Sequence, residues 1–215
     1  ILLRRAMQNP AYSHVVKDSA QFANEVAKIP ANPNYYFIKL DIKDYYMSGR
    51  AWELEHDCFS EYDKADQNYN CLRKIIQLLL DNQYVQSNEI IGRVFKVIKG
   101  TGQGLIHSGD LTDICLANKA EIHRAANARV KAEHGIVGFW RFRDDTAIIA
   151  SDRSKTLPYL WEYIKKADYF KITCDSVSSS GLTFLDVRVT HGKQFMMVTP
   201  TFKKTMLTTQ PLDLT

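Results

Sequence analysis

Hydrophobic residues recur along the chain with two different spacings, and each spacing predicts a different kind of element. Where apolar residues return every third or fourth position, the pattern is typical of an amphipathic helix. Where apolar, aromatic and β-branched residues run together or alternate with polar ones, the pattern is typical of a strand. We therefore expect helices over residues 13–29, 70–84, 108–133 and 157–170. We expect strands over residues 35–42, 90–98, 169–174, 182–190 and 194–202, and a hairpin over residues 138–150.

The order of these elements predicts an α+β fold in which helices back an antiparallel sheet. Residues 47–70 are polar and irregular, so we expect a surface helix or loop there and assign its acidic residues no role. Two acidic sites fall at strand ends: Asp41 near the end of the first strand, and Asp144 with Asp145 at or near the hairpin tip. Only the fold can bring these sites together, because they are far apart in the sequence.

Each acidic site admits two interpretations from its own residues. The adjacent carboxylates of Asp144 and Asp145 repel each other, which a divalent cation would relieve, but Asp is also common in solvated turns. Asp41 stands in an apolar strand, where an acid is costly unless it binds a metal or pairs with Lys39 or Lys43. Three carboxylates that converge on one edge of a sheet are the arrangement that two-metal phosphoryl transfer requires.

A glycine-rich turn, Lys99–Gly104, joins a predicted strand to the helix predicted from Ser108. Glycines just before a helix N-terminus let backbone amides approach phosphates or bases. The turn does not have the form GxGxxG, and no Gly-Lys-Ser or Gly-Lys-Thr follows it. Neither a dinucleotide-binding site nor a P-loop is therefore expected.

Composition and charge place the chain among ordinary globular proteins. Its 215 residues are enough for one domain or slightly more with a real core. Hydrophobic residues make up 45% and charged residues 24% of the chain, as in ordinary globular proteins. The net charge of +4 is compatible with a polyanionic partner. The four cysteines contain no CxxC pair, so neither a zinc site nor a disulfide framework is indicated.

Localisation follows from what the sequence lacks. There is no signal peptide and no apolar run of transmembrane length. We expect an intracellular protein, nuclear or cytoplasmic, that is not secreted and has no membrane partner. Because the chain starts without Met, we expect it to be a piece of something longer.

Four motifs, in this order, resemble the palm domain of reverse transcriptases. Asp41-x-x-Asp44-x-Tyr46 resembles motif A, Gln103-Gly104 resembles motif B, and residues 142–145, Phe-Arg-Asp-Asp, resemble the [YF]xDD box of motif C. Residues 181–187, Gly-Leu-Thr-Phe-Leu-Asp-Val, resemble the primer-grip segment. Their Phe-Leu-Asp-Val form, the glycine turn after it and residues 199–205 look most like Penelope-like retroelements. The resemblance covers about residues 35–215.

This resemblance implies an RNA-directed DNA polymerase from a retroelement, which adds dNTPs to a primer 3′-hydroxyl by two-metal-ion nucleotidyl transfer. Its partners would be an RNA template, a DNA primer and dNTPs. The catalytic residues that it implies are Asp41, Asp144 and Asp145. It also implies two Mg²⁺ ions, for which Mn²⁺ can substitute, held by Asp41, Asp144 and the main chain of Ile42.

The resemblance extends to the residues around the metal site. It implies nucleotide binding by Lys43, Asp44, Tyr45, Tyr46, Gln103 and Gly104. Tyr46 would be the aromatic gate that excludes a ribose 2′-hydroxyl. Phe184 and Leu185 would hold the primer end as a primer grip. The candidates for the general acid that protonates pyrophosphate are Lys171, Lys165 and Lys166.

Two residues depart from the family pattern. Motif B usually continues with Ser-Pro, where this chain has Ser108-Gly109. Motif C usually has a small or apolar residue at the position of Arg143. Arg143 could pair with Asp41, contact the primer backbone or mark a damaged copy.

The expected architecture is a polymerase palm with an RRM-like core and partial fingers. Residues 1–34 would be partial fingers or an N-terminal helical segment, with Arg4 and Arg5 as a remnant of the finger strands. Residues 35–215 would be the palm with its primer-grip hairpin, without a thumb. The missing fingers and thumb segments would belong to a longer polyprotein.

Two other functions stay open. One is a viral-type RNA-dependent RNA polymerase palm, against which Phe142 and Tyr46 argue. The other is a degenerate, catalytically inactive palm that acts as a nucleic-acid-binding module.

Overall fold

The computed structural model describes residues 9–86 and 92–201 of the chain. Several expectations fall partly outside this range. Three groups of residues lie outside the described residues: Arg4 with Arg5, residues 90 and 91 of the strand predicted over 90–98, and residues 202–205 of the C-terminal motif.

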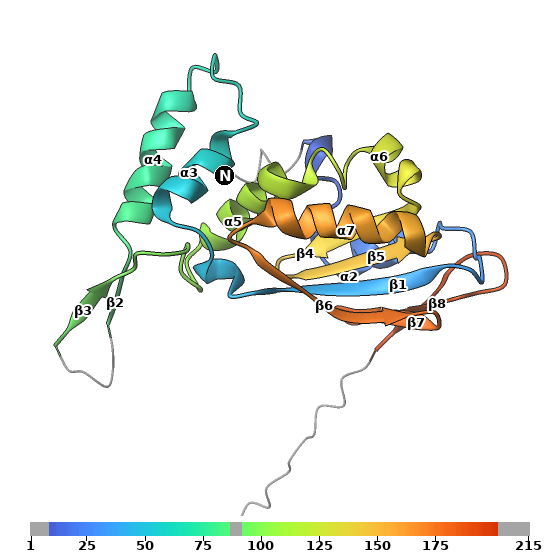
Figure 1. Cartoon of the computed structure of the whole chain (residues 1–215). Coiled ribbons are helices and arrows are strands. Elements are labelled where there is room, and N and C mark those ends of the chain that lie inside the picture. The colour runs from blue at the N-terminus through green and yellow to red at the C-terminus, as the bar shows by residue number, and fades with distance from the viewer. Residues whose placement is uncertain (1–8, 87–91, 202–215) are drawn as a thin grey trace, which may run out of the picture.

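A four-stranded antiparallel sheet forms the centre of the fold, as the sequence predicts (Figure 1). Its spatial order is β4-β5-β1-β6. The strands span Tyr36–Lys43 (β1), Ile136–Phe142 (β4), Asp145–Ala150 (β5) and Lys171–Ser178 (β6). With helices between β1 and β4 and between β5 and β6, this is the βαββαβ order of an RRM-like core, which confirms the expected fold class.

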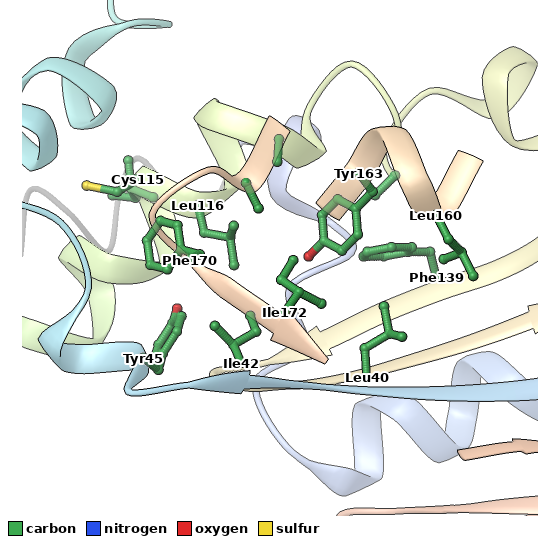
Figure 2. Packing of buried hydrophobic residues seen from close by; sticks show 14 of the residues in the cluster. Leu40, Ile42, Tyr45, Cys115, Leu116, Phe139, Leu160, Tyr163, Phe170 and Ile172 are labelled. Carbon is green, nitrogen blue, oxygen red and sulfur yellow. The ribbon is translucent and has the colours of Figure 1, made fainter. Parts of the chain in front are cut away.

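Helices cover one face of the sheet, and the alternation of side chains in β1 shows why (Figure 1). Leu40 and Ile42 point toward the helices and join the larger hydrophobic core with Tyr163 and Phe170 (Figure 2). The covering elements are α5 (Ser108–Leu116), a π-helical turn η3 (Ala117–Glu121), α6 (Ala128–Glu133) and α7 (Arg153–Ala167).

A second, smaller core lies on the other face of the sheet. Phe37 from β1 packs there with Phe22 and Phe184, whose ring centroids are 4.7 Å apart. This core joins the sheet to α2 (Ser19–Val26) and to a small sheet of β7 (Gly181–Phe184), β8 (Val187–Thr190) and β9 (Met197–Pro200). The central sheet is therefore buried on both faces over part of its length.

The helices α3 (Ala51–Phe59) and α4 (Tyr69–Asp81) and a hairpin of β2 (Tyr84–Gln86) and β3 (Val94–Lys96) lie toward one end of the sheet (Figure 1). Two 3-10 turns are η1 (Pro10–Tyr12) and η2 (Tyr45–Met47). In the described part of the chain, no helix is long and apolar enough to cross a membrane.

Five predictions about elements are corrected. The helix predicted over 13–29 forms over Ser19–Val26, and Val15 before it pairs with Arg141 of β4. The helix predicted over 108–133 is broken at η3, and the strand predicted over 182–190 is a hairpin that turns at Leu185, whose φ is +55°. Of the described part of the strand predicted over 90–98, which begins at residue 92, Val94–Lys96 pair with another strand. Residues 47–70 contain α3, and Asp57 in it is buried and bound by the side chains of Lys119 and Tyr169, so it is not a surface charge.

The N-terminal segment packs along β4. The N–H of Val16 donates to the carbonyl of Arg141, and the N–H of Arg141 donates to the carbonyl of His14, each over 2.9 Å. The segment before α2 thus lies against the outer strand of the sheet. The assignment of residues 1–34 to partial fingers stays a prediction.

Candidate active site

The three predicted catalytic acids lie together at one end of the two central strands. Asp41 of β1 is directly opposite Asp145 of β5 in the register, and the N–H of Ile42 donates to the carbonyl of Asp144 over 3.0 Å. Directly opposite residues project from the same face of a sheet. Because Ile42 points toward the helices, Asp41 and Asp145 project from the other face.

Burial and neighbouring charges both act on the carboxyl of Asp144. Partial burial raises the pKa of this carboxyl, and the charges of Asp145 and Asp41 raise it further. Lys39 works in the opposite direction. Folding thus disfavours the ionised form of Asp144, and a cation beside the three carboxylates would favour it again.

Lys39 does not pair with Asp41. Its Nζ lies 3.1 Å from Oδ1 of Asp145 and 3.6 Å from Oδ2 of Asp175. Within residues 9–86 and 92–201, the Asp41 carboxylate forms no salt bridge or side-chain hydrogen bond. The simplest structural explanation of Asp41, a pair with a neighbouring lysine, is thus not what the structure contains.

The acids fit Mg²⁺ as a site that substrate completes. In the described part of the chain, no three side chains of His, Cys, Asp or Glu form a ready-made metal cage. Mg²⁺ commonly binds through one or two carboxylates, several waters and substrate phosphates. Asp41 and Asp144 can supply the carboxylates, and a bound cation would offset the repulsion between the acids at Asp144.

A pocket of about 380 Å³ contains three of the predicted nucleotide-binding residues. Its lining is Tyr46, Gln103, Gly104, Leu105, Ile106, Ser108, Gly109, Asp110 and Arg143. The pocket adjoins the acids, because Arg143 in its lining is the residue directly before Asp144. The fold therefore brings the motifs at Tyr46, Gln103 and Arg143 to one place.

Tight packing of the glycine-rich turn against η2 forms one side of this pocket. The φ of Gly100 is +82°, and a Cβ on it would lie 2.2 Å from the carbonyl oxygen of Tyr46. The N–H of Thr101 donates to that same oxygen over 2.7 Å. Only glycine permits this approach, so Gly100 sets the position of Gln103 relative to Tyr46.

The other residues of motif A differ in exposure. Lys43 and Asp44 are exposed, and Asp44 has a left-handed backbone with φ of +52°. Tyr45 is buried, and its hydroxyl donates to Oδ1 of Asp113 over 2.6 Å. Its side chain is thus part of the core, and the role expected near the triphosphate is left to the main chain of Tyr45, where it stays a prediction.

A pair between Arg143 and Asp41 was one of the possibilities that the sequence allowed, and the structure does not contain it. Its Nη1 donates to Oδ2 of Asp113 in α5, and its Nη2 lies 3.6 Å from Oδ1 of Asp110. Burial opposes the charge, but Asp113 raises the pKa of the guanidinium. Arg143 is thus directed into the pocket wall and not toward Asp41.

Sequence analysis missed a buried charged network beneath the hairpin. Arg141 has no exposed surface, and its guanidinium donates to Glu121 over 2.8 Å and to Asp113 over 2.5 Å. Glu121 also contacts His14 and the hydroxyl of Tyr163, at 2.8 and 2.9 Å. Burial opposes the charge of Glu121, but Arg141 and His14 outweigh it and lower its pKa to about 2. A signal was present: Arg141 lies in an apolar strand, where a cation requires a buried acid.

The predicted primer grip divides between core and surface. Phe184 is fully buried against Phe22, so its side chain contacts no primer, which corrects that expectation. The alternation of β7 places Phe184 inward. Leu185 lies in the hairpin turn and is partly exposed, so the turn can still meet a ligand.

Of the three candidate general acids, Lys171 shares a face with the acids. It lies directly opposite Lys43, two residues from Asp41, and both lysines are exposed. Lys165 and Lys166 are in the last turn of α7, which covers the opposite face of the sheet. The structure therefore brings Lys171 to the site and leaves the other two away from it.

No protein-family profile and no curated protein matches the chain, but solved structures do. Apo telomerase from Candida tropicalis, truncated from its C-terminal domain, aligns with a TM-score of 0.68 and 16% identity, covering 91% of this chain and 43% of that chain. Telomerase from Candida albicans in complex with a TWJ fragment of telomeric RNA gives 0.67 and 12%, covering 93% and 37%. The BmCPV RNA-dependent RNA polymerase at elongation state gives 0.56 and 13%, covering 90% and 19%.

These likenesses show the fold. The chain has an α+β palm-like fold shared with telomerase and with a viral RNA polymerase. It spans less than half the length of each of these structures.

Proposed function

We propose that the chain is the palm of an RNA-directed DNA polymerase, a nucleotidyltransferase that adds dNTPs to a primer 3′-hydroxyl on an RNA template. One observation carries the proposal. Asp41 faces Asp145 across paired strands beside Asp144, next to the pocket that Tyr46 and Gln103 line. Origin from a retroelement, of a Penelope-like type, and location in a longer polyprotein are part of the same proposal.

Each part of the site has a role in this reaction. Asp41, Asp144 and the main chain of Ile42 would hold two Mg²⁺ ions, or Mn²⁺ in their place, with Asp145 as a neighbouring acid. Such ions, when bound, activate the 3′-hydroxyl and stabilise the leaving pyrophosphate. Lys39 keeps Asp145 in place through their 3.1 Å salt bridge.

The pocket and the lysines receive the substrate. Gln103, Gly104 and the main chain from Lys43 to Tyr45 border the nucleotide, and the ring of Tyr46 excludes a 2′-hydroxyl. Lys43 and Lys171 are like charges directly opposite each other, an arrangement that destabilises a sheet unless an anion lies between them. A triphosphate would be such an anion, and Lys171 can then give a proton to pyrophosphate.

Primer extension tests the proposal. A chain that includes the flanking segments should incorporate dNTPs on a primed poly-rA template with Mg²⁺ or Mn²⁺. Asp144→Asn should abolish incorporation, because it removes a metal-binding charge. The exposed Asp81, at the end of α4, provides the control Asp81→Asn, which should keep wild-type activity. Incorporation by Asp144→Asn at the wild-type rate would refute the assignment.

A viral-type RNA-dependent RNA polymerase is the second candidate, supported by the likeness to the BmCPV enzyme. The two functions differ in the sugar that they accept. Tyr46→Ala should raise the use of rNTPs relative to dNTPs, whereas Tyr46→Phe keeps the ring and should keep the ratio. A wild-type chain that prefers rNTPs would favour the viral-type function instead.

A degenerate palm that only binds nucleic acid is the third candidate. Arg143 suggested a damaged copy, but its fit against α5 supports a maintained site. The degenerate palm predicts binding of RNA in a mobility-shift assay without incorporation under any metal condition. Incorporation that depends on Asp144 would exclude it.

A further inference from the structure

The two residues that depart from the family pattern contact each other. Gly109 lies in the first turn of α5, and Arg143 lies in the turn between β4 and β5. A Cβ on Gly109 would lie 2.5 Å from Nη1 and 2.6 Å from Cζ of Arg143. Any side chain at position 109 would therefore displace the guanidinium, so the glycine and the arginine suit each other.

Arg143 is fixed at several points. The carboxylate of Asp113 accepts from its Nη1, and the guanidinium of Arg141 donates to its carbonyl oxygen over 3.1 Å. Its backbone has a φ of +54°, which non-glycine residues seldom adopt. A side chain held in this way keeps a defined direction before any ligand arrives.

The guanidinium is also part of the pocket wall. Among the described residues that line the pocket with Tyr46 and Gln103, Arg143 is the one cation. Its side chain keeps 31% of its surface exposed. Arginine has five N–H donors, and the contacts with Asp113 and Asp110 use only part of them. The free donors can meet the phosphate oxygens of a nucleotide.

We propose that Arg143 is a nucleotide-binding residue that contacts the phosphates of a nucleoside triphosphate in this pocket, and that Gly109 is required to admit it. The inference rests on the proposed function, because it assumes that the pocket holds the incoming nucleotide. The two departures from the family pattern, Gly109 and Arg143, are then explained together, because the glycine leaves room for the arginine.

Equilibrium dialysis of the full chain, without primer so that no product forms, tests the pair. The ligands are labelled dATP and labelled deoxyadenosine, which separates phosphate contacts from contacts with sugar and base. Arg143→Ala should weaken dATP binding by about tenfold, as expected for loss of a hydrogen bond to a charged group, and leave deoxyadenosine unchanged. Arg143→Gln can keep a hydrogen bond to Asp113 without the charge and should lose as much.

A double-mutant cycle tests the role of Gly109. Gly109→Ala should weaken dATP binding in the wild-type background but have no further effect when combined with Arg143→Ala. Arg129→Ala, which removes an exposed arginine of α6, is the control and should bind as the wild type does. Thermal unfolding of each variant identifies any loss that comes from misfolding.

The outcomes separate this inference from the proposed function. If Arg143→Ala and Arg143→Gln bind dATP within twofold of the wild type, or if Gly109→Ala weakens binding equally in both backgrounds, the pair has no such role. Those results can coexist with normal primer extension. A wild-type chain that binds no dATP would overturn both the role of Arg143 and the proposed function. If dATP binding depends on Arg143 but no dNTP is incorporated, the polymerase assignment is refuted and the role of Arg143 in binding is not.

Discussion

The carboxylate of Asp144 lies in the field of Asp145 and Asp41, and partial burial adds to their repulsion. Its pKa in the folded protein is therefore above the value in the unfolded chain. The ionised form is disfavoured by folding, so stability is lost as pH rises through the raised pKa. A residue that we propose as a cation ligand thus lowers the stability of the metal-free protein.

We predict that Asp144→Asn stabilises the metal-free protein at pH 7 by less than about 1 kcal/mol, the range of exposed charge pairs. The difference should disappear below about pH 3.9, where an ordinary Asp is protonated. Urea denaturation at both pH values measures it. Addition of Mg²⁺ should stabilise the wild type and not the variant; a less stable variant at pH 7 would contradict the argument.

Lys171 is the second residue with an individual prediction. Because it faces the acids and Lys165 does not, Lys171→Ala should lower the rate of incorporation by about 10²-fold, a common effect of losing a general acid, while Lys165→Ala should not. The pH–rate profile of Lys171→Ala should lose its basic limb. An unchanged profile would show that Lys171 transfers no proton.

At the scale of elements, the π-helical turn η3 places Glu121 against the β4–β5 hairpin, where it binds Arg141. Glu121 is fully buried, and it joins β4 through Arg141, α7 through Tyr163 and the N-terminal segment through His14. A buried acid with several charged and hydrogen-bonding partners fixes elements relative to each other. The position of the hairpin thus depends on a residue distant from the acids in sequence.

Glu121→Gln should destabilise the protein by about 3–5 kcal/mol, because it leaves the charge of Arg141 buried with less compensation. Glu133→Gln, in exposed α6, is the matched control and should change stability little. The pKa of Glu121 is lowered to about 2, so its contribution is present at neutral pH and is lost as pH falls from about 4 toward 2. Acid titration followed by circular dichroism should show a steeper loss in the wild type than in Glu121→Gln.

The elements also show how far the sequence could lead. The sheet could be predicted from the sequence, because apolar alternation and acids at strand ends are local signals. The pocket residues Tyr46 and Gln103 were implied only by the resemblance of their motifs to a known family. The hairpin at Leu185 was missed, because an apolar residue with positive φ looks like strand continuation. The break at η3 was missed for a related reason: its alanines and Glu121 suit a helix, and only the partners of Glu121 explain the turn.

At the scale of the whole molecule, the two cores on opposite faces of the sheet stabilise different parts of the fold. The helix-side core carries most of the fold, and the smaller core attaches α2 and the β7–β8 hairpin. Phe184 lies at the centre of this attachment. If the Phe184 side chain contacts the primer, its loss should weaken primer binding. If it is only part of the core, its loss should lower stability.

Phe184→Ala should lower the free energy of unfolding by about 3–5 kcal/mol, as for other buried aromatic residues. Urea denaturation measures this loss. Phe195→Ala, at a residue with half its surface exposed, should cost much less. A variant of Phe184 with normal stability and weakened primer binding would instead restore the primer-grip role of the side chain.

The pairing of the segment at Val15 with β4 has a consequence for anyone who shortens this protein. An outer strand with unpaired N–H and carbonyl groups invites pairing with another molecule. The bonds from His14 and Val16 to Arg141 occupy part of that edge. Trimming the first thirty residues as a dispensable leader would uncover it, and the product would then be prone to self-association through intermolecular sheet extension.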